Sequence, residues 1–278
     1  MKVVAINGSP RMDQGNTAKI LGPFLEGMRE AGAEVELFYT RQLKINPCLG
    51  QFTCFFKTPG NCSQKDDMQT LRPKLRNADV WVLASPVYLD GVTGPMKNLM
   101  DRTLPLLQPF LEMRDGHTRH PLWEGVKRGK VVLVSVCGLC EMDNFDPMVA
   151  HIKAFCKNLD REFAGALLRP NGAYLKEMAE MGLPMDDIFE AAREAGRQLV
   201  RDGEMLPETL GVIGRDLMTA EEFVEGANPT IQQMETSTLD LRVAGSAEAI
   251  IMVEAGADII SEATMLDALE LAHQSIQD

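Results

Sequence analysis

The chain has 278 residues, of which 40 are acidic and 28 basic, so its formal net charge is −12. This acidic balance argues against nucleic acid and anionic membranes as partners. Apolar runs stay well short of the roughly 18 residues that a membrane span needs, and a strand pattern begins at once, so we expect no signal peptide and a cytoplasmic location. Six cysteines in such a chain favour metal or redox chemistry over a disulfide framework.

Apolar segments with the spacing of strands alternate along the chain with segments that have the spacing of helices. We expect strands at residues 3–6, 34–39, 79–84, 130–136 and 163–168, and helices at 95–104, 147–159 and 185–201. Residues 41–69 should be irregular, and 108–129 a polar loop. The pattern predicts an α/β fold with a doubly wound, five-stranded parallel sheet in the order 2-1-3-4-5. A ligand of such a sheet lies at the carboxyl edge, beside the first and third strands.

The loop after the first strand carries the strongest signal for a ligand. Small and polar residues from Asn7 to Thr17 lead into a helix, so loop amides and the positive end of the helix dipole would surround an anion. Ser9, Asn16 and Thr17 add donors and Arg11 adds a positive charge. The lysine of a nucleoside-triphosphate loop and the Gly-x-Gly-x-x-Gly dinucleotide spacing are both absent. The loop therefore predicts a monophosphate site.

Residues 205–278 have a different pattern, and we expect them to form a helical extension to a domain at residues 1–204. Residues 262–276 place apolar side chains on one side of an amphipathic helix. This helix can pack on its own core or on a partner subunit. We favour the partner subunit, because an added apolar face must be buried somewhere.

Three segments resemble one known family, the NAD(P)H-dependent FMN reductase branch of the flavodoxin-like proteins. The first is the phosphate loop, Gly8-Ser9-Pro10-Arg11 to Gly15-Asn16-Thr17. The second, Ser85-Pro86-Val87-Tyr88 to Met96-Lys97 and Asp101-Arg102, is similar to the segment that wraps the flavin ring. The third, Ser135-Val136-Cys137-Gly138, resembles the loop that closes over the isoalloxazine. All three follow expected strands, and the resemblance covers about residues 1 to 200.

The resemblance implies an FMN-dependent oxidoreductase that passes electrons from NAD(P)H through the flavin to a quinone, a free flavin or another small acceptor. It also implies a homodimer or homotetramer with the flavin near the subunit interface. No side chain need act as acid or base, so no catalytic residue is assigned. The expected cofactor-binding residues are Ser9, Arg11, Gln14, Asn16, Thr17, Pro86, Val87, Tyr88, Leu89, Gly91, Ser135, Cys137 and Gly138.

Three cysteines raise an alternative function. Cys48, Cys54 and Cys62 resemble the first, third and fourth ligands of the iron–sulfur flavoproteins, a sister group that carries single electrons from ferredoxin. The second ligand position holds Gln51, whose amide oxygen is a poor ligand for an iron–sulfur cluster. We therefore favour a loop without a cluster. The alternatives are a cluster on three cysteines, aided by Cys140 or an external ligand, and a zinc site.

Two further questions remain open from the sequence. Cys137 and Cys140 form a Cys-x-x-Cys pair, either a redox dithiol beside the flavin or, as we favour, a structural loop. Tyr88 follows a strand end, where its ring would stack on the flavin or cap the sheet. A third class of function, an FMN-binding sensor without turnover, is supported only by the acidic extension.

Overall fold

The computed structural model describes the whole chain except residues 176–177, 179–181, 247 and 278. The chain divides into two compact units, Met1–Leu217 (unit 1) and Met218–Asp278 (unit 2). In the described parts of both units, no helix combines the length and the apolar character that crossing a membrane requires.

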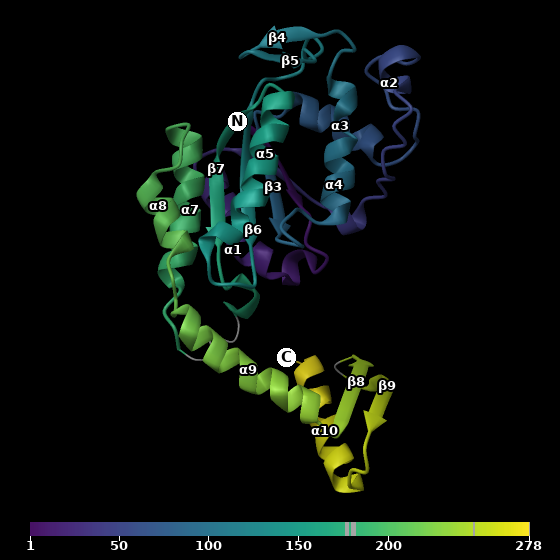
Figure 1. Cartoon of the computed structure of the whole chain (residues 1–278), viewed down its shortest axis with the longest axis vertical. Helices are drawn as coiled ribbons and strands as arrows, with labels where there is room; N and C mark the ends of the chain where they lie inside the picture. The colour runs from purple at the N-terminus through teal and green to yellow at the C-terminus, as the bar shows by residue number, and fades with distance from the viewer. Residues whose placement is uncertain (176–177, 179–181, 247, 278) are drawn as a thin grey trace. The chain divides into compact units, whose positions relative to one another are not determined.

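Unit 1 is built on a five-stranded sheet whose strands are all parallel (Figure 1). The order is β2-β1-β3-β6-β7, which confirms the predicted 2-1-3-4-5 arrangement of a flavodoxin-like α/β fold. Most residues of the three central strands are buried, which explains why their sequences are nearly continuous apolar runs. The strands are β1 (Lys2–Asn7), β2 (Glu34–Tyr39), β3 (Val80–Pro86), β6 (Lys130–Val136) and β7 (Glu162–Arg169).

Helices cover both faces of this sheet (Figure 1). On one face, α1 (Asn16–Glu30) packs along α7 (Asp186–Arg201), and α8 (Pro207–Gly214) packs on α7 and β7. The other face carries α3 (Met68–Asn77), α4 (Gly94–Asp101) and α5 (Asp146–Asn158). The expected helices at 95–104, 147–159 and 185–201 are therefore confirmed, with small shifts at their ends.

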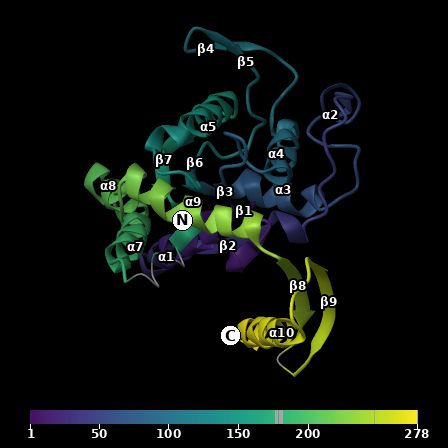
Figure 2. The ribbon, with the colours of Figure 1, turned by 60° about the horizontal axis from the view of Figure 1, so that its bottom comes forward.

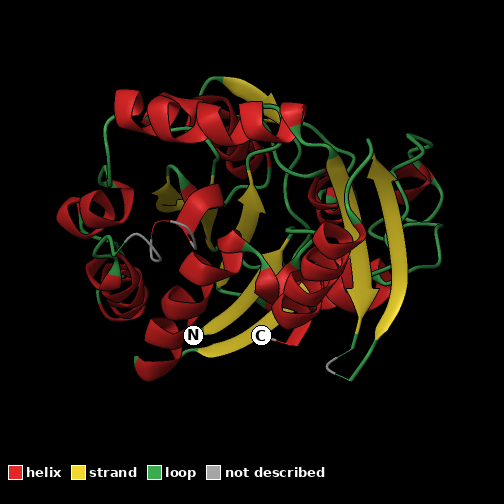
Figure 3. Cartoon of the chain, turned by 90° about the horizontal axis from the view of Figure 1, so that it is seen from below, coloured by secondary structure: helices red, strands yellow, loops and turns green. Residues whose placement is uncertain are grey.

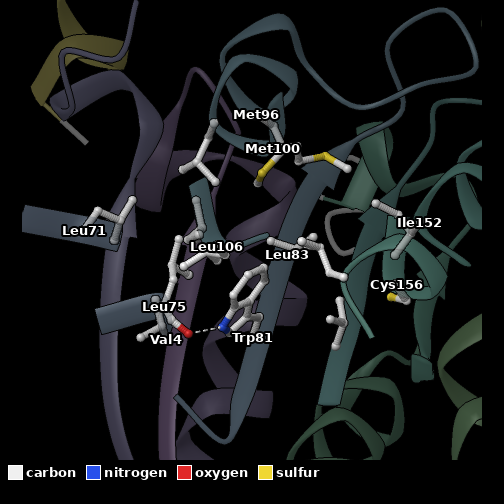
Figure 4. Packing of buried hydrophobic residues seen from close by; sticks show 14 of the residues in the cluster. Val4, Leu71, Leu75, Trp81, Leu83, Met96, Met100, Leu106, Ile152 and Cys156 are labelled. Carbon is white, nitrogen blue, oxygen red and sulfur yellow. Dashed lines mark hydrogen bonds between the residues drawn. The ribbon is translucent and has the colours of Figure 1, made fainter. Parts of the chain in front are cut away.

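The core between the sheet and the second helical face is centred on Trp81 (Figure 4). Its indole Nε1 donates a hydrogen bond to the Leu75 carbonyl, 2.9 Å away, so the buried polar atom has a partner. The Arg161 guanidinium lies over the Trp81 ring, 4.2 Å from its centroid. Apolar side chains of α3, α4 and α5 fill the remaining space against β1, β3 and β6.

The long connections of unit 1 contain more structure than the sequence predicted. The segment expected to be irregular contains the short helix α2 (Thr53–Phe56), and the expected polar loop contains the hairpin β4 (Glu112–Arg114) and β5 (His117–Arg119). This hairpin projects away from the sheet (Figures 1 and 2). Short 3-10 turns complete the unit: η1 (Met12–Gln14), η2 (Thr40–Gln42), η3 (Leu104–Leu106), η4 (Met142–Phe145) and η5 (Gly172–Tyr174).

Unit 2 contains the expected C-terminal helix, but it is not wholly helical. It consists of α9 (Ala220–Thr236), the antiparallel strands β8 (Leu239–Gly245) and β9 (Ile250–Ala257), and α10 (Glu262–Gln277), which packs against β8 (Figure 3). The hairpin was not predicted. The change between units falls after Leu217, whereas we expected it after residue 204, because α8 packs on α7 and β7. Among the side chains described in unit 2, none is buried.

Candidate functional site

The loop after β1 forms a tight cradle in front of α1. The Asn7 side chain organises it: its Oδ1 accepts from the Ser9 amide at 2.9 Å, and its Nδ2 donates to the Met12 carbonyl at 3.2 Å. Gly15 stands at the N-cap of α1, and no side chain caps this helix. The first amides of α1 therefore remain available to an anion, in the field of the helix dipole.

The five residues predicted in this loop are distributed between the cradle and the surface. Ser9 and Thr17 are buried, and the Thr17 Oγ1 has no hydrogen-bond partner among the described atoms. Arg11 and Gln14 are exposed. The Asn16 Nδ2 donates to the Ala173 carbonyl at 2.9 Å, which joins this loop to the one after β7. Because a buried hydroxyl normally has a hydrogen-bond partner, the unpartnered Thr17 hydroxyl indicates that a ligand binds here.

The turn after β3 exposes an aromatic and an aliphatic side chain to solvent. Tyr88 and Gly91 exchange backbone hydrogen bonds of 2.9 and 3.2 Å, and Leu89 and Asp90 between them have φ angles of 44° and 63°. Two adjacent left-handed residues without glycine are costly, and such strain is concentrated at functional sites. Tyr88 is 52% exposed and Leu89 fully exposed. The turn thus presents an apolar surface suited to a planar ring.

Hydrogen bonds connect this turn to the cradle. The Thr93 hydroxyl donates to the Gly8 carbonyl at 2.9 Å, and the Thr93 amide donates to the Ser85 Oγ at 3.0 Å. Pro86 ends β3, and the Val87 amide donates to the Val136 carbonyl at the end of β6. The predicted segments after β1, β3 and β6 therefore lie together at the carboxyl edge of the sheet.

In the loop after β6, the predicted residues differ in what they can offer. The Ser135 hydroxyl donates to the Ser85 carbonyl at 2.7 Å, and Ser135 is paired with β3 and β7 inside the sheet, so its side chain is already engaged. Burial raises the pKa of both Cys137 and Cys140, and the Cys137 Sγ lies 3.2 Å from the Leu139 carbonyl. A raised pKa keeps a thiol protonated and unreactive, which favours the structural interpretation of this pair.

The three cysteines of the second predicted site share one region of unit 1. Cys48 is exposed, Cys54 buried and Cys62 half-buried. Burial raises the pKa of Cys54, and repulsion from Cys62 and Cys48 adds to the shift, so the three sulfurs lie within electrostatic range. As arranged in the described residues, no group of three or more His, Cys, Asp or Glu side chains is set to hold a metal ion. Gln51 is exposed.

A buried ion pair fastens this cysteine segment to α4. Arg102 donates to both carboxylate oxygens of Asp66, at 2.7 and 3.1 Å, and to the Asn46 carbonyl at 2.7 Å. The side chains of Arg102 and Asp66 are 1% and 0% exposed. Arg102 was expected in the segment that wraps the flavin ring, but its guanidinium binds the cysteine segment.

This ion pair should make stability depend on pH. Burial acts to raise the pKa of Asp66, but hydrogen bonds from Arg102 and the Asn46 amide outweigh it, and the net pKa lies below the ordinary value. A carboxyl whose pKa is lower in the folded than in the unfolded protein stabilises the fold at pH values above its unfolded pKa. This stabilisation is lost as the pH falls through the lowered pKa of the folded protein. The free energy of unfolding should therefore decline below about pH 4. Asp66→Asn should flatten this decline in denaturant unfolding at pH 3 to 6, and an unchanged profile would contradict the assignment.

Comparison with known proteins shows which family the segments at this edge of the sheet resemble. Residues 1–123 match the model of the NADPH-dependent FMN reductase family. An iron–sulfur flavoprotein of Archaeoglobus fulgidus is 39% identical over 138 residues, which cover 50% of this chain and 56% of that protein. The N-terminal part of the chain is therefore similar to the FMN reductase family, over less than half of the chain's residues. The match confirms the resemblance drawn from the three loops.

Other known proteins show the same similarity, but the matches cover only part of the chains. An iron–sulfur flavoprotein of Methanocaldococcus jannaschii is 41% identical over 106 residues, or 38% of this chain and 53% of that protein. The chain spans about half the length of the curated relatives it matches here. An FMN-dependent NADH-azoreductase of Bacillus anthracis, solved with FMN, superposes with a TM-score of 0.51 at 16% identity over 72% of this chain and 99% of that one. This last likeness confirms the fold.

Unit 2 has an unrelated resemblance that the sequence analysis missed. Residues 227–275 match the model of the 3′ exoribonuclease family, domain 2. A polyribonucleotide nucleotidyltransferase of Halothermothrix orenii is 58% identical over 50 residues, which are 18% of this chain and 7% of that enzyme. The chain thus joins a segment that is similar to FMN reductases to a short segment that resembles part of a different family.

Proposed function

We propose that unit 1 binds FMN at the carboxyl edge of its sheet and transfers electrons from NAD(P)H to a small acceptor such as a quinone or a free flavin. The observation that carries this proposal is the uncapped N-terminus of α1 next to the buried, unpartnered Thr17 hydroxyl. A phosphate monoester would satisfy both. The family match and the exposed Tyr88 and Leu89 support it.

Each loop would contribute a different part of the site. The α1 amides with Ser9 and Thr17 would hold the phosphate, and Arg11 would add charge from the rim. Tyr88 and Leu89 would cover the ring and exclude water, while the backbone amides from Tyr88 to Gly91 and from Cys137 to Gly138 would orient its polar edge. The cofactor, when bound, supplies the hydride and electron chemistry. No side chain of this chain need move a proton.

Loss of the phosphate donors tests this assignment. Ser9→Ala and Thr17→Val should each weaken FMN binding about tenfold, because each removes a donor to a dianion in a buried site. Riboflavin lacks the phosphate, so its affinity should hold in both variants. Flavin fluorescence quenching measures both dissociation constants, and steady-state oxidation of NADH or NADPH with a quinone measures turnover. A wild-type chain that takes up no FMN would refute the proposal.

The second candidate is an iron–sulfur flavoprotein that exchanges single electrons, a role distinct from NAD(P)H turnover. Two observations favour it. Cys48, Cys54 and Cys62 are near enough for their charges to affect one another, and the curated relatives are iron–sulfur flavoproteins. Iron and flavin assays on protein purified without oxygen separate the two. About four irons per chain would establish the second candidate. Bound FMN with negligible iron, together with quinone turnover, would establish the first.

We also propose that the protein is cytoplasmic and acts as a homodimer or homotetramer with the flavin near the subunit interface. The support for the interface is the exposure of Tyr88 and Leu89, two large side chains at the edge of the proposed site. Light scattering after size-exclusion chromatography gives the number of subunits. A monomer at micromolar concentration would refute the interface.

A further inference from the structure

The turn that follows β7 was not among the predicted site residues, yet it has unusual features. Asn171 is 2% exposed, although it lies in a connection at the edge of the sheet. Its φ angle of 54° places it in the left-handed region, which few residues other than glycine, asparagine and aspartate occupy. Such a residue persists when its surroundings hold it in place, and positions of this kind are concentrated at functional sites.

Hydrogen bonds tie this turn to two of the loops in the proposed FMN site. The Asn171 amide donates to the Leu139 carbonyl at 2.9 Å, and the Gly172 amide donates to the Cys137 carbonyl at 2.8 Å. On the other side, the Asn16 Nδ2 donates to the Ala173 carbonyl at 2.9 Å. Residues 171–173 therefore bridge the loop after β6, assigned to the flavin ring, and the loop after β1, assigned to the phosphate.

The Asn171 side chain leaves one polar atom unused at this bridge. Its Oδ1 is buried and has no hydrogen-bond partner among the described atoms. A buried amide oxygen without a donor is costly, and such atoms in native proteins call for a ligand or an ordered water. The Thr17 Oγ1, in the cradle that the same turn contacts through Asn16, is a second such atom. The Asn171 Oδ1 can only accept a hydrogen bond, whereas the Thr17 hydroxyl can also donate one.

We propose that residues 171–173 form a fourth cofactor-binding loop, in which the Asn171 Oδ1 accepts a hydrogen bond from a ribityl hydroxyl of the flavin. This inference rests on the proposed FMN site and extends it. The ribityl chain is the part of FMN that joins the ring to the phosphate, and the turn joins the two protein loops assigned to those parts. A hydroxyl is the donor that a neutral amide oxygen would receive there.

The left-handed backbone at Asn171 makes a clean test available. Asn171→Gly keeps the favoured φ and removes only the side chain. The dissociation constants of FMN and riboflavin, measured by fluorescence quenching, should both rise about tenfold, because both ligands carry the ribityl chain. Thr17→Val should weaken FMN alone. The matched control is Asp115→Gly in the β4–β5 turn, which has a φ of 52° and is exposed; it should leave both constants within about twofold.

A second variant keeps the test decisive if the glycine variant does not fold. Asn171→Asp has nearly the same shape and retains an acceptor oxygen, so riboflavin binding should stay within about threefold of wild type. Loss of riboflavin binding in this folded variant would overturn the inference. So would unchanged binding in Asn171→Gly, or a loss confined to FMN. A wild-type chain that binds neither flavin refutes the FMN site itself, which is a separate outcome.

Discussion

Replacing Arg102 with methionine should lower the free energy of unfolding of unit 1 by about 3–5 kcal/mol. The substitution keeps an unbranched apolar side chain but leaves the Asp66 carboxylate buried without its cation. Removing one partner of a buried pair costs far more than the pair itself contributes, because the remaining charge has lost its water and its partner. Denaturant unfolding followed by tryptophan fluorescence measures the change, since Trp81 and Trp123 both lie in unit 1.

The same helix provides a matched control for this experiment. Lys97 and Asp101 of α4 form an ion pair of 2.6 Å, but both side chains are nearly half-exposed. Lys97→Ala should therefore change the free energy of unfolding by no more than about 0.5 kcal/mol. The double variant Arg102→Met with Asp66→Leu should recover part of the loss, because no buried charge remains. An Arg102→Met variant within about 1 kcal/mol of wild type would show that Asp66 is reached by water.

Gly15→Val should weaken FMN binding at least about 100-fold. A Cβ at Gly15 would stand 2.5 Å from the Ser9 Oγ and 3.2 Å from the Arg11 Cβ, so a branched side chain forces the cradle apart. The backbone at Gly15 is in the extended region, which valine accepts, so the effect comes from lost space in front of α1. Flavin fluorescence quenching measures the affinity, and thermal unfolding tests whether the fold is retained.

Gly22 supplies the control from the same helix. A Cβ there meets no atom within 4 Å, so Gly22→Ala should leave FMN affinity unchanged and stabilise the helix by about 0.5–1 kcal/mol. If Gly15→Val bound FMN within about threefold of wild type, the phosphate would have to lie elsewhere.

The sheet and the three loops could be predicted because their signals are local. The buried strand β3 begins with a continuous apolar run at 80–84, and the residues after the strand fix a turn by their own chemistry. The Arg102–Asp66 pair could not be found in this way, since its partners are 36 residues apart in sequence and only the packed fold brings them together. Asn171 was also missed, although Pro170, Asn171 and Gly172 form a recognisable turn signal after a strand.

The hairpin of unit 2 was missed for a different reason. Residues 239–243 alternate apolar and polar side chains with the period of a strand, but the surrounding Ala, Glu and Leu residues favour a helix. The alternation was the better guide, because β8 shows the same alternation in its exposure. Periodicity and spacing gave no sign that this segment resembles another family, and the comparison with the exoribonuclease domain revealed the resemblance.

The two units also divide the electric charge of the chain very unequally. Unit 2 carries 12 acidic residues and, as its single Lys or Arg, Arg242, so nearly all of the net charge of −12 resides in its 61 residues. Its strand β9 exposes Ile251, Met252 and Val253, the kind of uncovered edge that pairs with copies of itself. We expect mutual repulsion of the carboxylates to keep such strands apart near neutral pH. Acidification to about pH 4 should weaken that repulsion, and light scattering should then detect association of copies of the chain through β9.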